Sequence, residues 1–306
     1  MRRLAIRERL TLSWLLLAAA ALEPIVGWTL DRRTFVAASL GAPFAAQASC
    51  QGGALAPEQA VPGAYQQACM ELETRRIPID NTSSLVIHQE ASGPGSTGMA
   101  VWNSSLLLLR LLQRIVEREP EFLRERTALE LGCGPGLVSL ALKKWGASRV
   151  WATDGNPRVV ELAAKNARAN GLDEVVRCEV LQWGLLDASE YSASLVVGSD
   201  LTYNSGNWRA LAETMSTIAN DYVLYLSLGH AGFDVNAEVE GFLTVARDQG
   251  LIPVAGPNDS HWPFATISMS LTDLLLQDCV RPEERSILQA TGGARVLLLR
   301  KKVTSV

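Results

Sequence analysis

The stretch Thr127-Ala-Leu-Glu-Leu-Gly-Cys-Gly-Pro-Gly136 decides the fold. It begins as a short apolar run with one acidic residue, Glu130, and continues with Gly132, Gly134 and Gly136 at alternate positions. After it, apolar side chains recur at the spacing of a helix that buries one face. The order of strand, glycine turn and helix is that of a parallel crossover unit. Because glycine has no Cβ, these positions permit positive φ and let a ligand lie against the backbone.

The spacing of the glycines narrows the class of ligand. A dinucleotide-binding fingerprint needs a third glycine or an alanine where this chain has Leu137, which argues against NAD. A phosphate-binding P-loop ends in Gly-Lys-Ser/Thr, and Gly136-Leu137 supplies neither the lysine nor the hydroxyl. The remaining pattern, Glu-x-Gly-x-Gly-x-Gly, resembles the glycine loop of class I S-adenosylmethionine-dependent methyltransferases.

A second acidic residue, Asp154, ends the next apolar segment and lies 24 residues after Glu130. This distance accommodates one helix and one return strand. A carboxylate at the carboxyl end of a parallel strand can accept hydrogen bonds from ribose hydroxyls. Asp154 is also suited to a turn or a helix cap, because Asn156-Pro157 follows and proline fits the first helical position.

Composition and charge limit the function classes. The chain has 306 residues, of which 48% are hydrophobic, enough for one substantial α/β domain with an extension. Its net charge of −4 provides no basic footprint, so we expect no nucleic-acid partner. The five cysteines lack a CxxC pair and the three histidines lack ligand spacing. We therefore expect no metal site, no disulfide framework and a reducing compartment.

Residues 1–60 differ in composition from the rest. The segment of the first nine residues is basic as a whole, residues 10–22 form an apolar run, and an Ala/Ser-rich segment follows. This pattern is typical of a targeting or anchoring segment, although a docked amphipathic helix or a misassigned translation start remains open. The apolar run is shorter than the roughly 20 residues of a membrane span. We expect an intracellular protein, cytoplasmic or organelle-targeted, with membrane contact only if this segment is retained.

Strands and helices alternate after residue 70. A hairpin is expected around Asp80-Asn81. The expected strands of the main sheet are 127–131, 150–154, 175–181, 195–199, 222–228, 264–271 and 294–301, with helices through 106–112, after 137, over 157–170 and over 236–249. This alternation predicts a Rossmann-like α/β fold with a mostly parallel seven-stranded sheet and helices on both faces. Ligands bind beyond the carboxyl ends of such strands, so Gly132, Asp154, Trp183 and Asp200 should share one rim.

Five segments carry a resemblance to a known family. They are Val101-Trp102-Asn103-Ser104, Leu129 to Gly136, Thr153-Asp154, Leu181-Gln182-Trp183-Gly184 and Ser199-Asp200-Leu201-Thr202-Tyr203. In this order they resemble the seven-β-strand protein-lysine methyltransferases of methyltransferase family 16. The resemblance covers residues 70–302 and predicts a methyltransferase domain there, preceded by the extension of residues 1–60.

The resemblance implies a role for each matching residue. S-adenosylmethionine is the implied cofactor. Trp102 would close over the methyl donor, and Gly132, Cys133 and Gly134 would line its amino-acid end. Asp154 would bind the ribose, and Trp183 with Ser199 would lie at the adenine side. Asp200 and Tyr203 match the Asp-x-x-Tyr element beside the transferred methyl group and are the implied catalytic residues.

The implied activity is methyl transfer to a lysine of a protein substrate by an enzyme that we expect to be a monomer. Without the resemblance, Asp200 is also explained as a turn residue and Tyr203 as a packing aromatic. The chain differs from many relatives at Ser227-Leu228-Gly229-His230, where they have a more basic, aromatic segment. A small-molecule methyltransferase and a non-catalytic Rossmann-like binding module are the alternatives.

Overall fold

The computed structural model describes residues 69–91, 97–185, 190–229, 234–277, 287–288 and 293–302. The extension of residues 1–60 and His230 lie outside these ranges, and so do the expectations about them. No helix within the described ranges has the length and apolar character that crossing a membrane requires.

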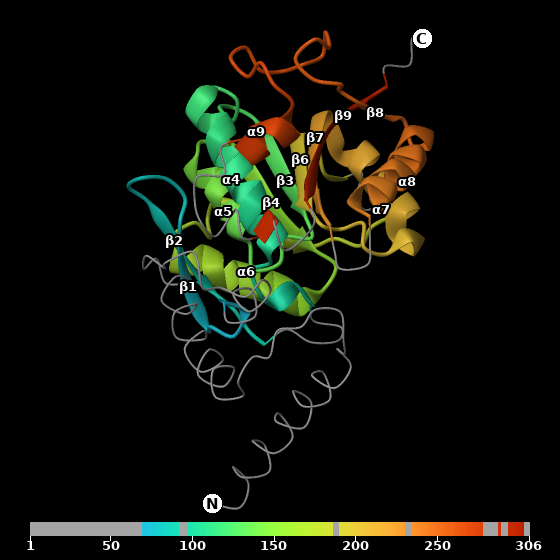
Figure 1. Cartoon of the computed structure of the whole chain (residues 1–306). Helices are drawn as coiled ribbons and strands as arrows, with labels where there is room; N and C mark the ends of the chain where they lie inside the picture. The colour runs from blue at the N-terminus through green and yellow to red at the C-terminus, as the bar shows by residue number, and fades with distance from the viewer. Residues whose placement is uncertain are drawn as a thin grey trace, which may run out of the picture. The chain divides into compact units, whose positions relative to one another are not determined.

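A seven-stranded sheet forms the centre of the fold (Figure 1). Its strand order is β5-β4-β3-β6-β7-β9-β8. The first four pairings are parallel, and β9 is antiparallel to both β7 and β8. The strands are β3 (Thr127–Leu131), β4 (Arg149–Asp154), β5 (Val176–Val180), β6 (Ala193–Ser199), β7 (Ala219–Leu228), β8 (Leu251–Pro253) and β9 (Ala294–Lys301). The predicted fold class is confirmed.

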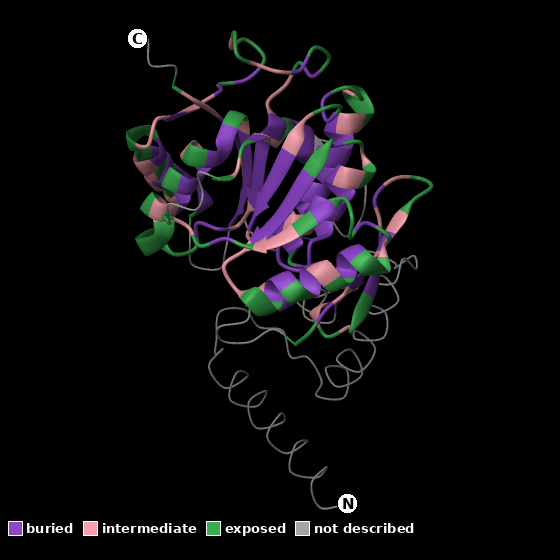
Figure 2. Cartoon of the chain, turned by 180° about the vertical axis from the view of Figure 1, so that it is seen from behind, coloured by how far each residue is buried: buried purple, intermediate pink, exposed green. Residues whose placement is uncertain are grey.

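Helices cover both faces of this sheet. Figure 1 shows α7 and α8 on one side, away from α4 and α5. The helices are α4 (Asn103–Arg118), α5 (Leu137–Lys144), α6 (Pro157–Ala169), α7 (Trp208–Ile218), α8 (Val235–Asp248) and α9 (Leu271–Gln277). Leu195 and Val197 of β6 pack into the core on the α4 side, whereas Val196 packs into the core on the α7 side. The central strands are therefore buried on both faces, as expected of a parallel sheet between helices (Figure 2).

A small antiparallel hairpin, β1 (Thr74–Pro78) and β2 (Ser84–His88), docks on α6, as the sequence predicted. The fully buried Asn166 of α6 accepts a hydrogen bond from His88 N (2.7 Å) and donates to His88 O (3.0 Å) and Pro135 O (2.9 Å). Gln89, just after the hairpin, accepts a hydrogen bond from Val101 N (2.9 Å). The hairpin is thus connected to the glycine loop and to the segment that enters α4.

The expected strand over residues 264–271 is wrong. These residues form a loop that leads into α9, and the missing sheet position belongs to the short strand β8. Trp262 Nε1 donates a hydrogen bond to Ile267 O (2.9 Å), and the Phe264 ring packs 4.8 Å from that of Phe122. The apolar pattern therefore reflects side chains that anchor a loop. The helices α7 and α9 were not among the expected elements.

The cysteines differ from expectation at one position. Cys133 and Cys178 are free thiols. Cys69, however, is disulfide-bonded, which the sequence did not predict.

Candidate active site

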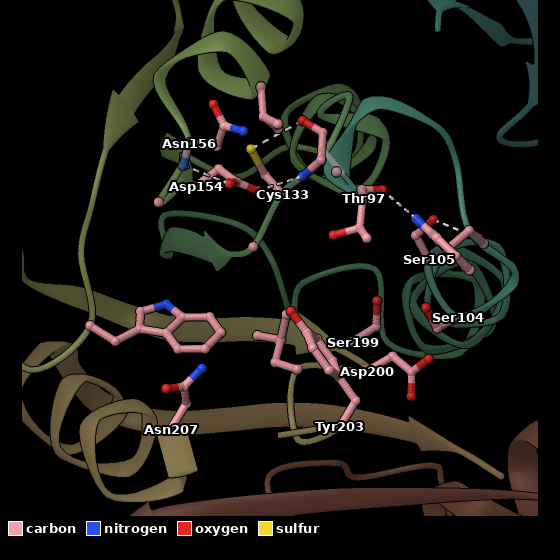
Figure 3. Close-up of a pocket in the computed structure, with 18 of the residues that line it drawn as sticks. Thr97, Ser104, Ser105, Cys133, Asp154, Asn156, Ser199, Asp200, Tyr203 and Asn207 are labelled. Carbon is pink, nitrogen blue, oxygen red and sulfur yellow. Dashed lines mark hydrogen bonds between the residues drawn. The ribbon is translucent and has the colours of Figure 1, made fainter. Parts of the chain in front are cut away.

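A cavity of about 660 Å³ opens at the carboxyl ends of β3, β4 and β6 (Figure 3). All nine residues singled out from the sequence line it: Trp102, Gly132, Cys133, Gly134, Asp154, Trp183, Ser199, Asp200 and Tyr203. The expectation that the strand ends share one rim is confirmed. The volume lies within the range of small-molecule sites.

The glycine loop forms one end of the cavity. Gly132, Gly134 and Gly136 have φ of 61°, 52° and 87°, in the left-handed region that favours glycine. A Cβ on Gly132 would lie 2.5 Å from Cδ2 of Leu201, so the packing at this position also favours a residue without a side chain. The loop therefore presents bare backbone to the cavity.

Glu130 stabilises the glycine loop by contacting the start of α5. Its Oε2 accepts hydrogen bonds from the backbone N (2.8 Å) and Oγ (2.5 Å) of Ser139 in the first turn of α5. Burial raises the pKa of this carboxyl to about 8. Glu130 is not a lining residue of the cavity. Its contacts are those of a structural brace.

Asp154 combines the two roles that the sequence left open. Its Oδ2 accepts a hydrogen bond from Gly134 N (3.3 Å) and its Oδ1 accepts one from Asn156 N (3.0 Å), while the side chain lines the cavity. Burial raises its pKa, and these hydrogen bonds oppose the shift. The helix cap itself is Asn156, which accepts from Arg158 N at the start of α6. Asp154 thus ties the glycine loop to the turn before α6.

Trp102 lies at the mouth of the cavity, directly before α4. Its side chain is 37% exposed, and its Nε1 donates a hydrogen bond to Thr97 O (2.6 Å). This bond fixes the edge of the ring. Ser104 and Ser105, in the first turn of α4, also line the cavity.

The turn after β6 forms the opposite end (Figure 3). Asp200 has a φ of 58°, which is unfavourable for a residue with a side chain. Its N donates to Leu226 O (2.8 Å), and its Oδ1 accepts from Leu228 N (3.3 Å). The end of β7 therefore holds Asp200 in this conformation. Tyr203, which follows in the same turn, is 65% exposed.

Buried side chains support this turn from beneath. The hydroxyl of the fully buried Tyr225 accepts hydrogen bonds from Leu201 N (2.7 Å) and Thr202 N (3.0 Å). Trp208 Nε1 donates to Thr202 O (2.7 Å). Burial raises the pKa of Tyr225, so its hydroxyl stays protonated. Sequence reasoning missed these supports and also Glu238 of α8, which lines the cavity, because no local motif connects them to Asp200.

The lining has a uniform sign of charge. Asp154, Asp200 and Glu238 contribute carboxyl groups, and the described lining contains no lysine, arginine or histidine. Burial raises the pKa of Cys133 well above its ordinary value, so this thiol is not a nucleophile at neutral pH. The cavity is therefore suited to cationic ligands.

The donor set fits S-adenosylmethionine. The glycine backbone can accommodate its amino-acid portion, the carboxylate of Asp154 can accept from ribose hydroxyls, and the Trp183 ring offers a flat apolar surface for the adenine. The fold and this cavity together have the features of the class I, Rossmann-like methyltransferases.

Comparison with known proteins shows similarity to methyltransferases. A family model described as "Lysine methyltransferase" matches residues 79–229. The protein-lysine N-methyltransferase EFM3 of Chaetomium thermophilum is 31% identical over 212 residues, which cover 63% of this chain and 60% of the relative. The ribosomal protein L11 methyltransferase of Thermotoga maritima is 40% identical over 83 residues, 26% of this chain and 30% of the relative. The matches thus span less than two thirds of these relatives.

Among solved structures, the fold is similar to that of a putative S-adenosylmethionine-dependent methyltransferase from Streptococcus mutans. The TM-score is 0.48 at 13% sequence identity, over 75% of this chain and 56% of the other.

Proposed function

We propose that the protein is an S-adenosylmethionine-dependent N-methyltransferase that methylates a lysine side chain of a protein substrate. One observation carries this proposal: a single cavity has a glycine cradle at one end, the strained Asp200 at the other, and, among its described lining residues, no charged side chains other than carboxylates. The similarity to a protein-lysine N-methyltransferase supports the choice of acceptor.

One end of the cavity would bind the methyl donor, and the other would bind the acceptor. Gly132, Cys133 and Gly134 would hold the amino-acid end of the donor and Asp154 the ribose. Trp183 with Ser199 would bind at the adenine side. Trp102, held by Thr97 O, would close over the donor. Asp200 and Tyr203 would act on the acceptor.

The bound donor supplies a methyl group on a sulfonium, so that the bond from nitrogen to methyl carbon forms as the carbon–sulfur bond breaks with its electrons passing to sulfur. The residues of this chain have to bind and align the acceptor amine. Asp200, fixed by Leu226 O and Leu228 N, would attract the ammonium and orient it. A lysine with a pKa of about 10.4 must lose a proton before it attacks. Because the side chain of Tyr203 is exposed, this end of the cavity is open to solvent, and the proton would leave to water.

We further propose that residues 70–302 form the catalytic domain and that the enzyme acts as a monomer. The described elements that build the cavity run from η2 (Thr97–Met99) to α8 of a single chain. That one chain supplies all of these elements supports the proposal of a monomer.

The test is incubation of the full-length protein with methyl-labelled S-adenosylmethionine and a cell lysate. We expect label in the protein fraction and, after acid hydrolysis, in methylated lysine, with little label when Asp200→Asn replaces the wild type. Label confined to small molecules would support the alternative acceptor class. Absence of labelling, together with absence of donor binding by folded protein, would contradict any methyltransferase activity.

A further inference from the structure

Glu238 lies in the first turn of α8 and lines the cavity, although no sequence motif pointed to it. Its carboxylate is the third in the lining, after Asp154 and Asp200.

A chain of hydroxyl groups fixes the carboxylate of Glu238. Its Oε1 accepts hydrogen bonds from Thr202 Oγ1 and from Ser227 Oγ (3.0 Å). The Tyr225 hydroxyl accepts from two backbone N–H groups, so its own hydrogen is available for Thr202 Oγ1 at 2.8 Å. The hydrogen of Thr202 then points to Glu238. Within the described part of the chain, no hydrogen bond ends on the second oxygen, Oε2.

The same strand end holds both acceptor-side carboxylates. Ser227 binds Glu238, and the next residue, Leu228, donates its N–H to Asp200 Oδ1 (3.3 Å). Thr202, which binds Glu238, lies two residues after Asp200 in one turn. Ser227 and Leu228, at the end of β7, therefore help to place two carboxylates at one end of the cavity.

We infer that Glu238 is a specificity-determining residue that receives the ammonium group of the acceptor together with Asp200. This inference rests on the proposed function. Two carboxylates attract a cationic side chain more strongly than one. They also disfavour a neutral acceptor of the same shape, because it would displace water from both carboxylates without supplying a positive charge.

The substitution Glu238→Gln isolates the charge. Glutamine keeps the length of the side chain and an oxygen that can accept from Thr202 and Ser227, and it removes only the negative charge. Glu240→Gln is the matched control, because Glu240 is exposed on the same helix and pairs with Arg295 at 3.7 Å, outside the cavity lining. Both variants change the net charge by the same amount.

The experiment uses full-length protein saturated with S-adenosylhomocysteine, which cannot transfer a methyl group. Titrations followed by NMR compare the lysine analogue N-acetyl-lysine methylamide with the neutral N-acetyl-norleucine methylamide. We expect wild type and Glu240→Gln to prefer the lysine analogue and Glu238→Gln to bind it about 10-fold or more weakly, as loss of a charged hydrogen bond implies. The affinity for S-adenosylhomocysteine and the unfolding temperature should not change.

Three results would overturn the inference: equal affinity of Glu238→Gln and wild type for the lysine analogue, a wild type that does not distinguish the two analogues, or a Glu238→Gln protein with a lower unfolding temperature and weaker binding of S-adenosylhomocysteine. The last would assign the loss to the fold. Failure of the wild type to bind S-adenosylhomocysteine would instead contradict the proposed function itself, so the two failures are distinguishable.

Discussion

The two ends of the cavity are constructed differently. The glycine end comes from one continuous stretch, Thr127 to Asp154, and depends on backbone conformation with Glu130 and Asp154 as braces. The Asp200 end is a short turn held by side chains from β7, α7 and α8, which lie up to 38 residues further along the chain.

This difference predicts that the functions of the two ends can be separated by mutation. Changes in the glycine loop should act on donor binding and folding together, since the same backbone serves both. Changes in the Asp200 turn should act on turnover with the donor still bound.

The largest effect is expected for Asp200→Asn. Loss of the charge that orients the acceptor should lower kcat/KM. The decrease corresponds to a loss of about 2–5 kcal/mol of transition-state stabilisation. Donor affinity should stay within about twofold, as one turn is changed and the glycine loop is not. Steady-state methylation and calorimetric donor titration check the two halves, with the exposed Asp248→Asn as control. A wild-type rate would exclude Asp200 from the chemistry.

Gly132→Ala should disturb the contact between the two ends of the cavity. An alanine here must adopt a φ of 61° and place its Cβ 2.5 Å from Leu201, the residue after Asp200. We expect a loss of about 2–4 kcal/mol in the free energy of unfolding. Gly171→Ala is the matched control, with a φ of 66° and no atom within 4 Å of the added Cβ, so only the backbone cost of about 1–2 kcal/mol should remain. Equal losses in denaturant unfolding would show that the Leu201 contact is unimportant.

Asp154→Ala should weaken donor binding by about 1.5–3 kcal/mol, the contribution of a charged hydrogen bond. Turnover at saturating donor should change much less. Calorimetry with S-adenosylhomocysteine measures the affinity, and the exposed Asp173→Ala in the loop before β5 controls for the charge change. Unchanged affinity would leave Asp154 as a structural tie between the glycine loop and α6.

The last prediction concerns pH. Because the pKa of Glu130 is about 8 in the folded protein, against 4.5 as its ordinary value, the native state holds a proton that the unfolded chain releases between these values. The free energy of unfolding should therefore fall as pH rises through this window, by at most about 1.4 kcal/mol per pH unit. Glu130→Gln should flatten this slope in denaturant unfolding from pH 5 to 8, and the exposed Glu161→Gln should not. Identical slopes in all three proteins would contradict the assignment.

The same contrast explains what could be predicted from the sequence. The glycine end is local, so the spacing of Glu130, the glycines and Asp154 predicted both the strands and the rim that they share. The supports of the Asp200 turn are brought together only by the sheet order, which places β7 beside β6. Tyr225 and Glu238 therefore carried no signal until the fold was known. The loop at residues 264–271 was missed for a related reason, since its apolar side chains pack without forming a strand.

The most direct test of the account is an electron-density map of the full-length protein with bound S-adenosylhomocysteine. We predict that the ribose lies against Asp154, the amino-acid end against Gly132 to Gly134, and the sulfur atom toward Asp200 and Tyr203. Density for the ligand outside this cavity, or with its sulfur turned away from Asp200, would contradict the proposal that one cavity joins a donor end to an acceptor end.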